Sequence, residues 1–172
     1  MTMRIMLPAL TLLACSPTPI AAPPPYVTSM ATPLLVAHNR ERSAVDAPLL
    51  VWDPALAAAA LAYARQLARL GRLQHSPRSA RPGQGENLWI GTRGAYSLDA
   101  MAATWAAEQR HFRPGRFPAN SRTGNWADVG HYSQMIWPTT GSLGCGLASS
   151  AQWDVLVCRY SPPGNVDGVM LR

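Results

Sequence analysis

Residues 142–165 read Ser-Leu-Gly-Cys-Gly-Leu-Ala-Ser-Ser-Ala-Gln-Trp-Asp-Val-Leu-Val-Cys-Arg-Tyr-Ser-Pro-Pro-Gly-Asn. Apolar residues dominate 142–148 and 153–160, and the small polar residues between them are typical of a turn. The stretch therefore predicts two antiparallel strands joined as a hairpin. Upstream, Glu86-Asn-Leu-Trp-Ile90 predicts a further strand. A small antiparallel sheet is expected.

Four segments before this hairpin have helical patterns. The clearest begins after Asp53, a good N-cap, with Pro54 in the first helical position, and Gly71 ends it. Its apolar residues recur at helical spacings, at Leu56, Ala60, Tyr63, Leu67 and Leu70. Further helices are predicted over 32–44, 97–112 and 130–137, with loops over 76–85 and 113–127. Helices around a small sheet make the expected fold α+β.

The first residues resemble an export signal. A positive start through Arg4 precedes an apolar run from Ile5 to Ala14, which is too short to span a bilayer. Leu12-Leu-Ala-Cys15 resembles the lipobox of bacterial lipoproteins, so residues 1–15 are expected to be removed and Cys15 to be lipidated. The alternative is cleavage after Ala22 and a freely secreted protein. Residues 16–29, rich in Pro and Ala, are predicted to be a tether before a single domain over 30–172.

The cysteine count agrees with export. The chain has three cysteines, and an odd number leaves one of them unpaired. If Cys15 is lipidated or removed with the signal, Cys145 and Cys158 remain as a pair. Oxidising surroundings outside the cytoplasm favour a disulfide between them.

Composition indicates a folded domain with a positive charge. The 172 residues are 48% hydrophobic and 14% charged, the net charge is +6, and all 15 cationic residues are arginine. Arg110-His-Phe-Arg-Pro-Gly-Arg-Phe117, with Arg122 beyond it, is a candidate contact with anionic lipid or cell wall, although such a run is more commonly a solvated loop. No nucleic-acid motif is present.

One carboxylate interrupts an apolar helix face. Met101, Trp105, Glu108 and Phe112 are spaced by 4, 3 and 4 residues and share one side of the third predicted helix. A carboxylate within an apolar face must be paired, protonated or exposed in a polar cleft, because burying it alone is costly. Glu108 is therefore a candidate site residue, unless it lies at the edge of the face and reaches water.

Three more polar residues lie where loops could place a site. His75 follows the second predicted helix, Glu86 precedes an apolar segment, and His131 begins the short helix. Each histidine alone is more commonly structural than functional. The chain has no His-Glu-x-x-His helix, no Gly-x-Ser-x-Gly elbow, no phosphate loop and no dinucleotide fingerprint. Ser133 is two residues from His131 and would face elsewhere on a helix, so an ordinary Ser-His-Asp hydrolase is not expected.

An ordered set of motifs resembles one known family. The motifs, spread over about residues 33–166, are His38-Asn-x-x-Arg42, Leu50-Val-Trp-Asp53, His75-Ser76, Gly85-Glu-Asn-Leu88, Trp105-x-x-Glu108, Gly130-His-Tyr-Ser-Gln-Met-Ile-Trp137, Gly144-Cys-Gly146 and Val157-Cys-Arg-Tyr-Ser-Pro-Pro-Gly-Asn165. Together they resemble the CAP superfamily (SCP/PR-1-like), and the last is similar to its plant PR-1 branch. The chain resembles a bacterial-type single-domain member, with one Cys pair where plant members have three.

The resemblance implies an α-β-α sandwich with a cleft lined by two His and two Glu. By motif these are His75, Glu86, Glu108 and His131. The resemblance assigns the two histidines to a divalent metal, expected to be zinc, and places Glu86 and Glu108 beside them as candidate catalytic residues.

The expected function is binding outside the cytoplasm. The resemblance favours a small apolar ligand, a lipid or sterol, together with the cation, and Trp89, Tyr96, Trp126 and Trp153 are candidate apolar contacts, although ordinary packing is the commoner role. The alternatives are a metal-assisted hydrolase, because a bound cation activates water, and a structural envelope protein. We expect a secreted or envelope-anchored monomer with no nucleic-acid partner, attached to the membrane only through the lipid.

Overall fold

The computed structural model describes residues 25–171. The expected export signal, the lipobox with Cys15 and most of the expected tether lie outside these residues. The helices are α1 (Pro25–Ser43), α2 (Pro54–Leu70), α3 (Leu98–Ala106) and α4 (Gly130–Met135), with short 3-10 turns η1 (Arg78–Ala80), η2 (Ala107–His111) and η3 (Trp126–Asp128). The strands are β1 (Val51–Trp52), β2 (Gly85–Thr92), β3 (Gly115–Arg116), β4 (Ser142–Ser149), β5 (Trp153–Ser161) and β6 (Met170–Leu171).

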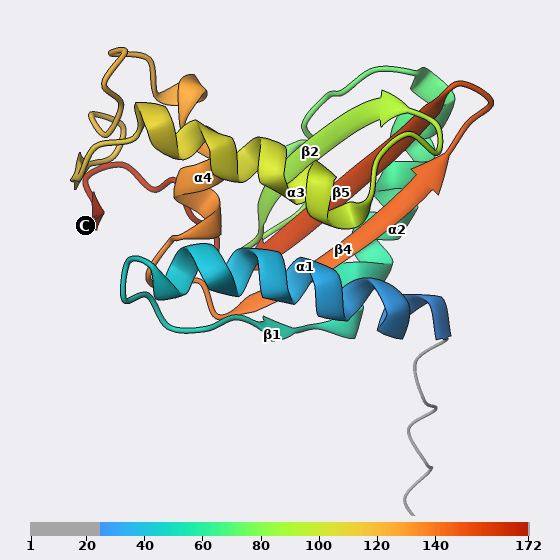
Figure 1. Ribbon diagram of the computed structural model, residues 1–172, viewed down its shortest axis with the longest axis horizontal. Coiled ribbons are helices and arrows are strands. Elements are labelled where there is room, and N and C mark those ends of the chain that lie inside the picture. Colours follow the sequence, from blue (N-terminus) through green and yellow to red (C-terminus); the bar gives the residue numbers. More distant parts are fainter. Residues whose placement is uncertain (1–24, 172) are drawn as a thin grey trace, which may run out of the picture.

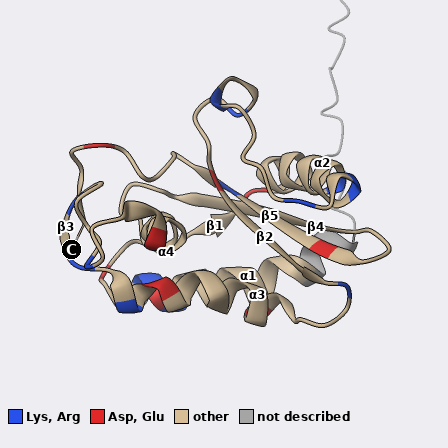
Figure 2. Ribbon diagram, turned by 90° about the horizontal axis from the view of Figure 1, so that it is seen from above, with Lys and Arg blue, Asp and Glu red and all other residues tan. Residues whose placement is uncertain are grey.

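A four-stranded sheet in the order β1-β4-β5-β2 forms the middle layer. Helix α2 covers one face, and α1, α3 and α4 lie on the other, as the views from two directions agree (Figures 1 and 2). The predicted hairpin is confirmed, because β4 and β5 pair antiparallel with Cys145 opposite Cys158. The disulfide predicted between these two residues is present. The fold is the expected α-β-α sandwich.

Local signals in the sequence fix the bounds of α2. The Asp53 carboxylate accepts hydrogen bonds from the backbone N–H groups of Ala55 and Leu56 at 2.7 and 3.1 Å, so it caps two of the free donors of the first turn. At the other end Gly71 has a φ of 64°, the left-handed conformation that glycine adopts without a steric penalty, and its N–H bonds the Leu67 carbonyl.

The sequence misplaced the ends of three other helices. Helix α1 begins at Pro25, so it starts earlier than the expected residue 32 and includes residues 25–29 of the expected tether. Proline is disfavoured inside a helix but well suited to a first helical turn, where its missing N–H is not needed. The α-helical part of α3 ends at Ala106, and the tighter turn η2 that replaces the expected helix to residue 112 is a common helix ending. Helix α4 ends at Met135 because the following Pro138 disfavours helical backbone at Trp137.

Two features of the sheets were not predicted from the sequence. The two-residue strand β1 pairs parallel with β4, so the sheet is not purely antiparallel. Strands β3 and β6 form a separate two-stranded sheet, which brings the end of the chain onto the loop 113–127.

The core lies on both faces of the sheet. The larger cluster fills the space toward α1, α3 and α4 and includes Met101, Trp105, Tyr132, Trp137, Leu143, Leu156 and Tyr160. The smaller cluster lies under α2 and includes Ala60, Ala64, Leu67, Leu88, Val155 and Val157. In the described part of the chain no helix is both long and apolar enough to cross a bilayer.

One buried arginine joins α1 to the end of α4. The Arg42 guanidinium is wholly buried and donates to the backbone carbonyls of Pro48, Met135, Trp137 and Thr140. Burial lowers the pKa of Arg42 to about 10, which leaves it charged at neutral pH. The motif His38-Asn-x-x-Arg42 therefore contains a cation that fixes the carboxyl end of the helix carrying His131.

Candidate functional site

The first half of the site is a buried carboxylate on β2. Glu86 is the second residue of β2, after Gly85, and its side chain is 0% exposed. One oxygen, Oε1, accepts from His75 Nδ1 at 2.8 Å and from the Ser76 backbone N–H at 3.0 Å. The other, Oε2, accepts from the Ser76 hydroxyl at 3.0 Å and lies 3.0 Å from an Arg159 guanidinium nitrogen. Both oxygens are therefore engaged.

These partners keep Glu86 ionised. Burial alone would raise the pKa of the Glu86 carboxyl. The hydrogen bond from His75, the charge of Arg159 and the two bonds from Ser76 outweigh burial and lower that pKa below its ordinary value of 4.5. Glu86 is thus a fixed negative charge that orients the His75 ring.

The second half joins η2 to the first turn of α4. Glu108 Oε1 accepts from His131 Nδ1 at 2.6 Å, and Glu108 Oε2 accepts from the backbone N–H groups of His131 and Tyr132 at 2.9 and 3.1 Å. The indole of Trp105 stacks on the His131 ring, with centroids 6.0 Å apart and an interplanar angle of 17°. The partner that the apolar helix face required for Glu108 is therefore His131 and its backbone.

The two pairs are held near each other through β2. Asn87 follows Glu86, and its amide donates to the His131 backbone carbonyl at 3.1 Å. Gly85 lies so close to α4 that an added Cβ would be 2.1 Å from the Gln134 amide oxygen. The fold therefore places the amino end of β2, which carries the Glu86–His75 pair, against the helix that carries the His131–Glu108 pair.

Both pairs have the same chemistry. In each, a carboxylate accepts a hydrogen bond from Nδ1, so in the neutral ring the proton lies on that nitrogen and Nε2 keeps its lone pair. Within residues 25–171, neither His75 Nε2 nor His131 Nε2 has a hydrogen-bond partner, and the two side chains are 57% and 33% exposed. A carboxylate that orients a histidine through one nitrogen is the usual outer-shell arrangement for a histidine that binds metal through the other.

Of these four side chains, only the two histidines have an atom left free for a cation, and the two glutamates do not. Both oxygens of each glutamate already accept hydrogen bonds, so the glutamates orient the rings and are not free ligands. Among the described residues no group of three or more His, Cys, Asp or Glu side chains is arranged to hold a metal. A cation here would complete its shell with water or a ligand.

Sequence reasoning missed Arg159 and Ser76 as parts of the site. Arg159 lies within the apolar strand β5 and is 4% exposed, and its guanidinium is 5.4 Å from the centre of the Tyr63 ring. A lone cation inside a buried strand needs an anionic partner, and this signal could have linked Arg159 to Glu86.

The other predicted contact residues divide into buried and exposed groups. Trp89 is 8% exposed and packs against Tyr96, so it belongs to the core, whereas Tyr96, Trp126 and Trp153 are exposed. In the 110–117 loop, Phe112 and Phe117 are buried against Tyr132 and Trp137. These two phenylalanines cannot contact a lipid surface.

A surface hollow lies elsewhere on the molecule. Its volume is about 380 Å³, and its lining includes Val45, Ala47, Ile136, Pro138, Met170 and Leu171. None of the four His and Glu residues of the site lines it.

Comparisons with known proteins agree with the fold and identify the family. The model of the cysteine-rich secretory protein family, CAP, matches residues 35–160. A pathogenesis-related protein of PR-1 type from Sambucus nigra is 36% identical over 135 residues, which are 77% of this chain and 75% of the relative. Peptidase inhibitor 16 of Homo sapiens is 32% identical over 96% of this chain, which spans only 36% of that longer protein. A crystal structure of NaASP2 with Zn2+ superposes with a TM-score of 0.72 at 24% identity, covering 87% of this chain and 88% of the other.

Proposed function

Since this chain belongs to the cysteine-rich secretory protein (CAP) family, whose members are generally secreted, we propose that it binds a divalent cation and a small apolar ligand outside the cytoplasm. The observation that carries the cation is the pair of His–Glu contacts, in which Nδ1 of each ring is fixed and Nε2 is left without a partner among the described residues. The NaASP2 structure with Zn2+ supports zinc as the cation to test first.

In this proposal His75 and His131 hold the cation through Nε2. Glu86 and Glu108 keep each ring in the required tautomer and orientation, which makes the free nitrogen a better metal ligand. Bound zinc would supply a Lewis acid that polarises a water molecule or an oxygen atom of a ligand.

The geometry favours binding over metal-assisted hydrolysis. A hydrolase of this kind needs a carboxylate that faces the attacking water and takes its proton. All four carboxylate oxygens of Glu86 and Glu108 instead accept bonds from His75, Ser76, His131 and Tyr132. The two carboxylates therefore serve better as orienting groups than as general bases.

Thermal unfolding with and without zinc tests the cation site. Zinc that binds the folded state alone raises the midpoint through linkage, and we expect this rise for the unchanged chain near neutral pH. The double variant His75→Ala, His131→Ala should fold and lose the rise. His111→Ala is the matched control, because His111 lies in η2 and contacts Arg110 instead of a carboxylate. An unresponsive wild type, or an equal loss in the control, contradicts the proposal.

The hollow beside Ile136 is the proposed place for the apolar ligand. Apolar side chains line it together with one carboxylate, that of Asp46, and Met170 is 48% exposed. Ala47→Trp should fill the hollow and abolish displacement of a fluorescent fatty acid, whereas Ala44→Trp, at an exposed position nearby, should not. Equal displacement in both variants would place the ligand elsewhere.

We further propose that Cys15 is lipidated. This rests on the apolar run before Leu12-Leu-Ala-Cys15 and on the complete pairing of the other two cysteines. Mass spectrometry of the amino-terminal peptide from the membrane fraction tests it. A protein that starts after Ala22 would contradict it.

A further inference from the structure

The carboxyl half of α2 and the loop after it carry a concentrated positive charge. Residues 54–85 contain five arginines and no Asp or Glu. The next carboxylate along the chain, Glu86, is fully buried and already paired with His75 and Arg159. One third of the arginines of the chain therefore lie in a segment without an acidic residue of its own.

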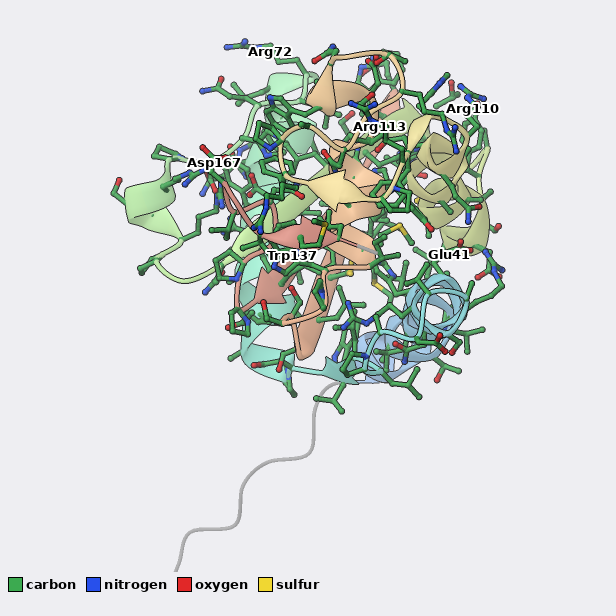
Figure 3. All side chains as sticks on the ribbon, turned by 90° about the vertical axis from the view of Figure 1, so that its left-hand side faces the viewer. Glu41, Arg72, Arg110, Arg113, Trp137 and Asp167 are labelled. Atoms are coloured by element: carbon green, nitrogen blue, oxygen red, sulfur yellow. A yellow bond between two sulfur atoms is a disulfide. The ribbon has the colours of Figure 1, made fainter. Side chains whose placement is uncertain are left out.

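Three of these arginines point away from the protein. The core-facing side of α2 carries Ala60, Ala64 and Leu67. At 100° per residue, Arg65 and Arg69 lie on the opposite side of the helix. Arg72 follows the Gly71 cap and projects outward from the top of the view in Figure 3, and the carboxyl end of α2 is blue in Figure 2. In the described part of the chain none of the three forms an ion pair.

Exposed apolar side chains lie among these arginines. Leu70 is 57% exposed and Leu73 is 38% exposed. Trp153, at the start of β5, is 38% exposed, and its indole lies 3.7 Å from the point where a Cβ on Gly71 would stand. The β4–β5 turn and the end of α2 thus meet at one end of the molecule (Figure 1). We call this surface the basic end, and its residues are Arg65, Arg69, Leu70, Arg72, Leu73 and Trp153.

We propose that the basic end docks the protein on the surface of an anionic phospholipid bilayer. Arginines attract an anionic headgroup layer, and exposed leucine and tryptophan side chains insert at the boundary between headgroups and acyl chains. Tryptophan is favoured at this boundary because its ring is amphipathic. A soluble polyanion would pair with the arginines but would leave Leu70, Leu73 and Trp153 without a role, so the mixed surface fits a bilayer better.

This inference differs from the proposed cation and ligand sites. It uses none of the four His and Glu residues and none of the residues of the hollow. It also differs from the expected contact through the 110–117 loop, because the two phenylalanines there are buried.

Co-sedimentation with vesicles tests the inference. Phosphatidylcholine vesicles with and without phosphatidylglycerol are incubated with the full chain carrying Cys15→Ala, which removes the proposed lipid anchor, and with charge-reversal variants of that chain. Arg69→Glu, Arg72→Glu should weaken binding to the anionic vesicles by about thirtyfold or more, because each arginine near such a surface contributes several-fold. Arg110→Glu, Arg113→Glu changes the charge equally at another place (Figure 3) and should bind nearly as the Cys15→Ala parent does.

The apolar residues provide a second measurement. Leu70→Ser, Trp153→Ser should weaken vesicle binding and should remove the blue shift of tryptophan fluorescence that accompanies insertion, yet should leave retention on a heparin column unchanged. Equal loss in the 110/113 control, or binding that does not depend on phosphatidylglycerol, overturns the proposal. Loss of heparin retention in the 69/72 variant with undiminished vesicle binding also overturns it and assigns the surface to a soluble polyanion.

Discussion

Buried ionisable side chains in this protein form hydrogen bonds or ion pairs with specific residues, and His38 is the clearest case. Its Nδ1 lies 2.7 Å from the Leu34 carbonyl, which only accepts, so that nitrogen carries the proton. Its Nε2 therefore accepts from the Tyr160 hydroxyl at 2.8 Å. Burial, reinforced by the charge of Arg42 and opposed by the Leu34 bond, lowers the pKa of His38 to about 4.

His38 should make the folded state sensitive to mild acid. As the pH falls below 6.5, His38 becomes protonated in the unfolded state. In the folded state it stays neutral until the pH reaches about 4. Its contribution is fully present above pH 6.5 and is lost across that window, by up to about 3 kcal/mol of unfolding free energy. Urea unfolding between pH 7 and 4 should show a steeper decline for wild type than for His38→Gln. Equal slopes would contradict the burial argument, and His111→Gln should keep the wild-type slope.

Glu108 allows the orienting role to be tested separately from the ligand role. Glu108→Gln keeps the shape and the ability to accept from the backbone N–H groups of His131 and Tyr132 but removes the charge beside His131 Nδ1. Loss of such an outer-shell carboxylate lowers metal affinity by about 10- to 100-fold. In a calorimetric zinc titration, Glu108→Gln should bind zinc with this lower affinity. His131→Ala should not bind zinc at all. An unchanged zinc affinity in Glu108→Gln would contradict the orienting role of Glu108.

Sequence reasoning reached part of this residue-scale description. The position of Glu108 on an apolar face left pairing, protonation and exposure to water as alternatives, and periodicity within one helix could not identify His131 on another as its partner. The four carbonyl partners of Arg42 could not be predicted either, because they belong to two segments far apart in the sequence, one after α1 and one at the end of α4, that only the whole fold brings together.

At the scale of elements, α2 lies unusually close to the sheet. A Cβ at Gly144 would be 2.2 Å from the Ala57 backbone nitrogen, and one at Gly146 would be 2.3 Å from the Leu61 Cα. The two glycines of the motif Gly144-Cys-Gly146 therefore allow the backbone of α2 to approach β4 closely, because they have no side chains there. The glycine spacing was visible in the sequence, but its reason appears only when helix and strand are seen together.

Gly144→Ala should destabilise the protein strongly. The added methyl must push α2 away from β4 along its backbone, and overpacking of this kind costs roughly 1–3 kcal/mol or more. Gly141→Ala is the matched control, because nothing lies within 4 Å of its Cβ position and its φ is not positive. Denaturant midpoints should fall clearly for Gly144→Ala alone. Equal denaturant midpoints for both variants would show that α2 can move away from β4 with little loss of unfolding free energy.

The elements that were predicted correctly have strong local patterns. Strands β4 and β5 have long apolar runs around one turn, and α2 has both caps and a regular stripe. Strands β1, β3 and β6 have two residues each, too few for periodicity to indicate a strand. Their pairing is set by tertiary contacts.

At the scale of the whole molecule, two proposed attachments would act on one chain. The lipid on Cys15 would hold the amino terminus at a membrane, and the basic end would hold the folded domain against the same surface. Linked attachments reinforce each other, because the first raises the local concentration for the second.

Cell fractionation with salt washes should separate these attachments. Wild type should resist high salt, because acyl chains bind through the hydrophobic effect, which salt does not screen. Cys15→Ala should remain on membranes at low salt and be released at high salt, since attraction between arginines and anionic headgroups is screened. Adding Arg69→Glu, Arg72→Glu to Cys15→Ala should release the protein at low salt, whereas adding Arg110→Glu, Arg113→Glu should not. Complete release of Cys15→Ala at low salt would leave the lipid as the sole anchor. A wild-type protein that high salt removes would instead leave the arginines as the sole anchor.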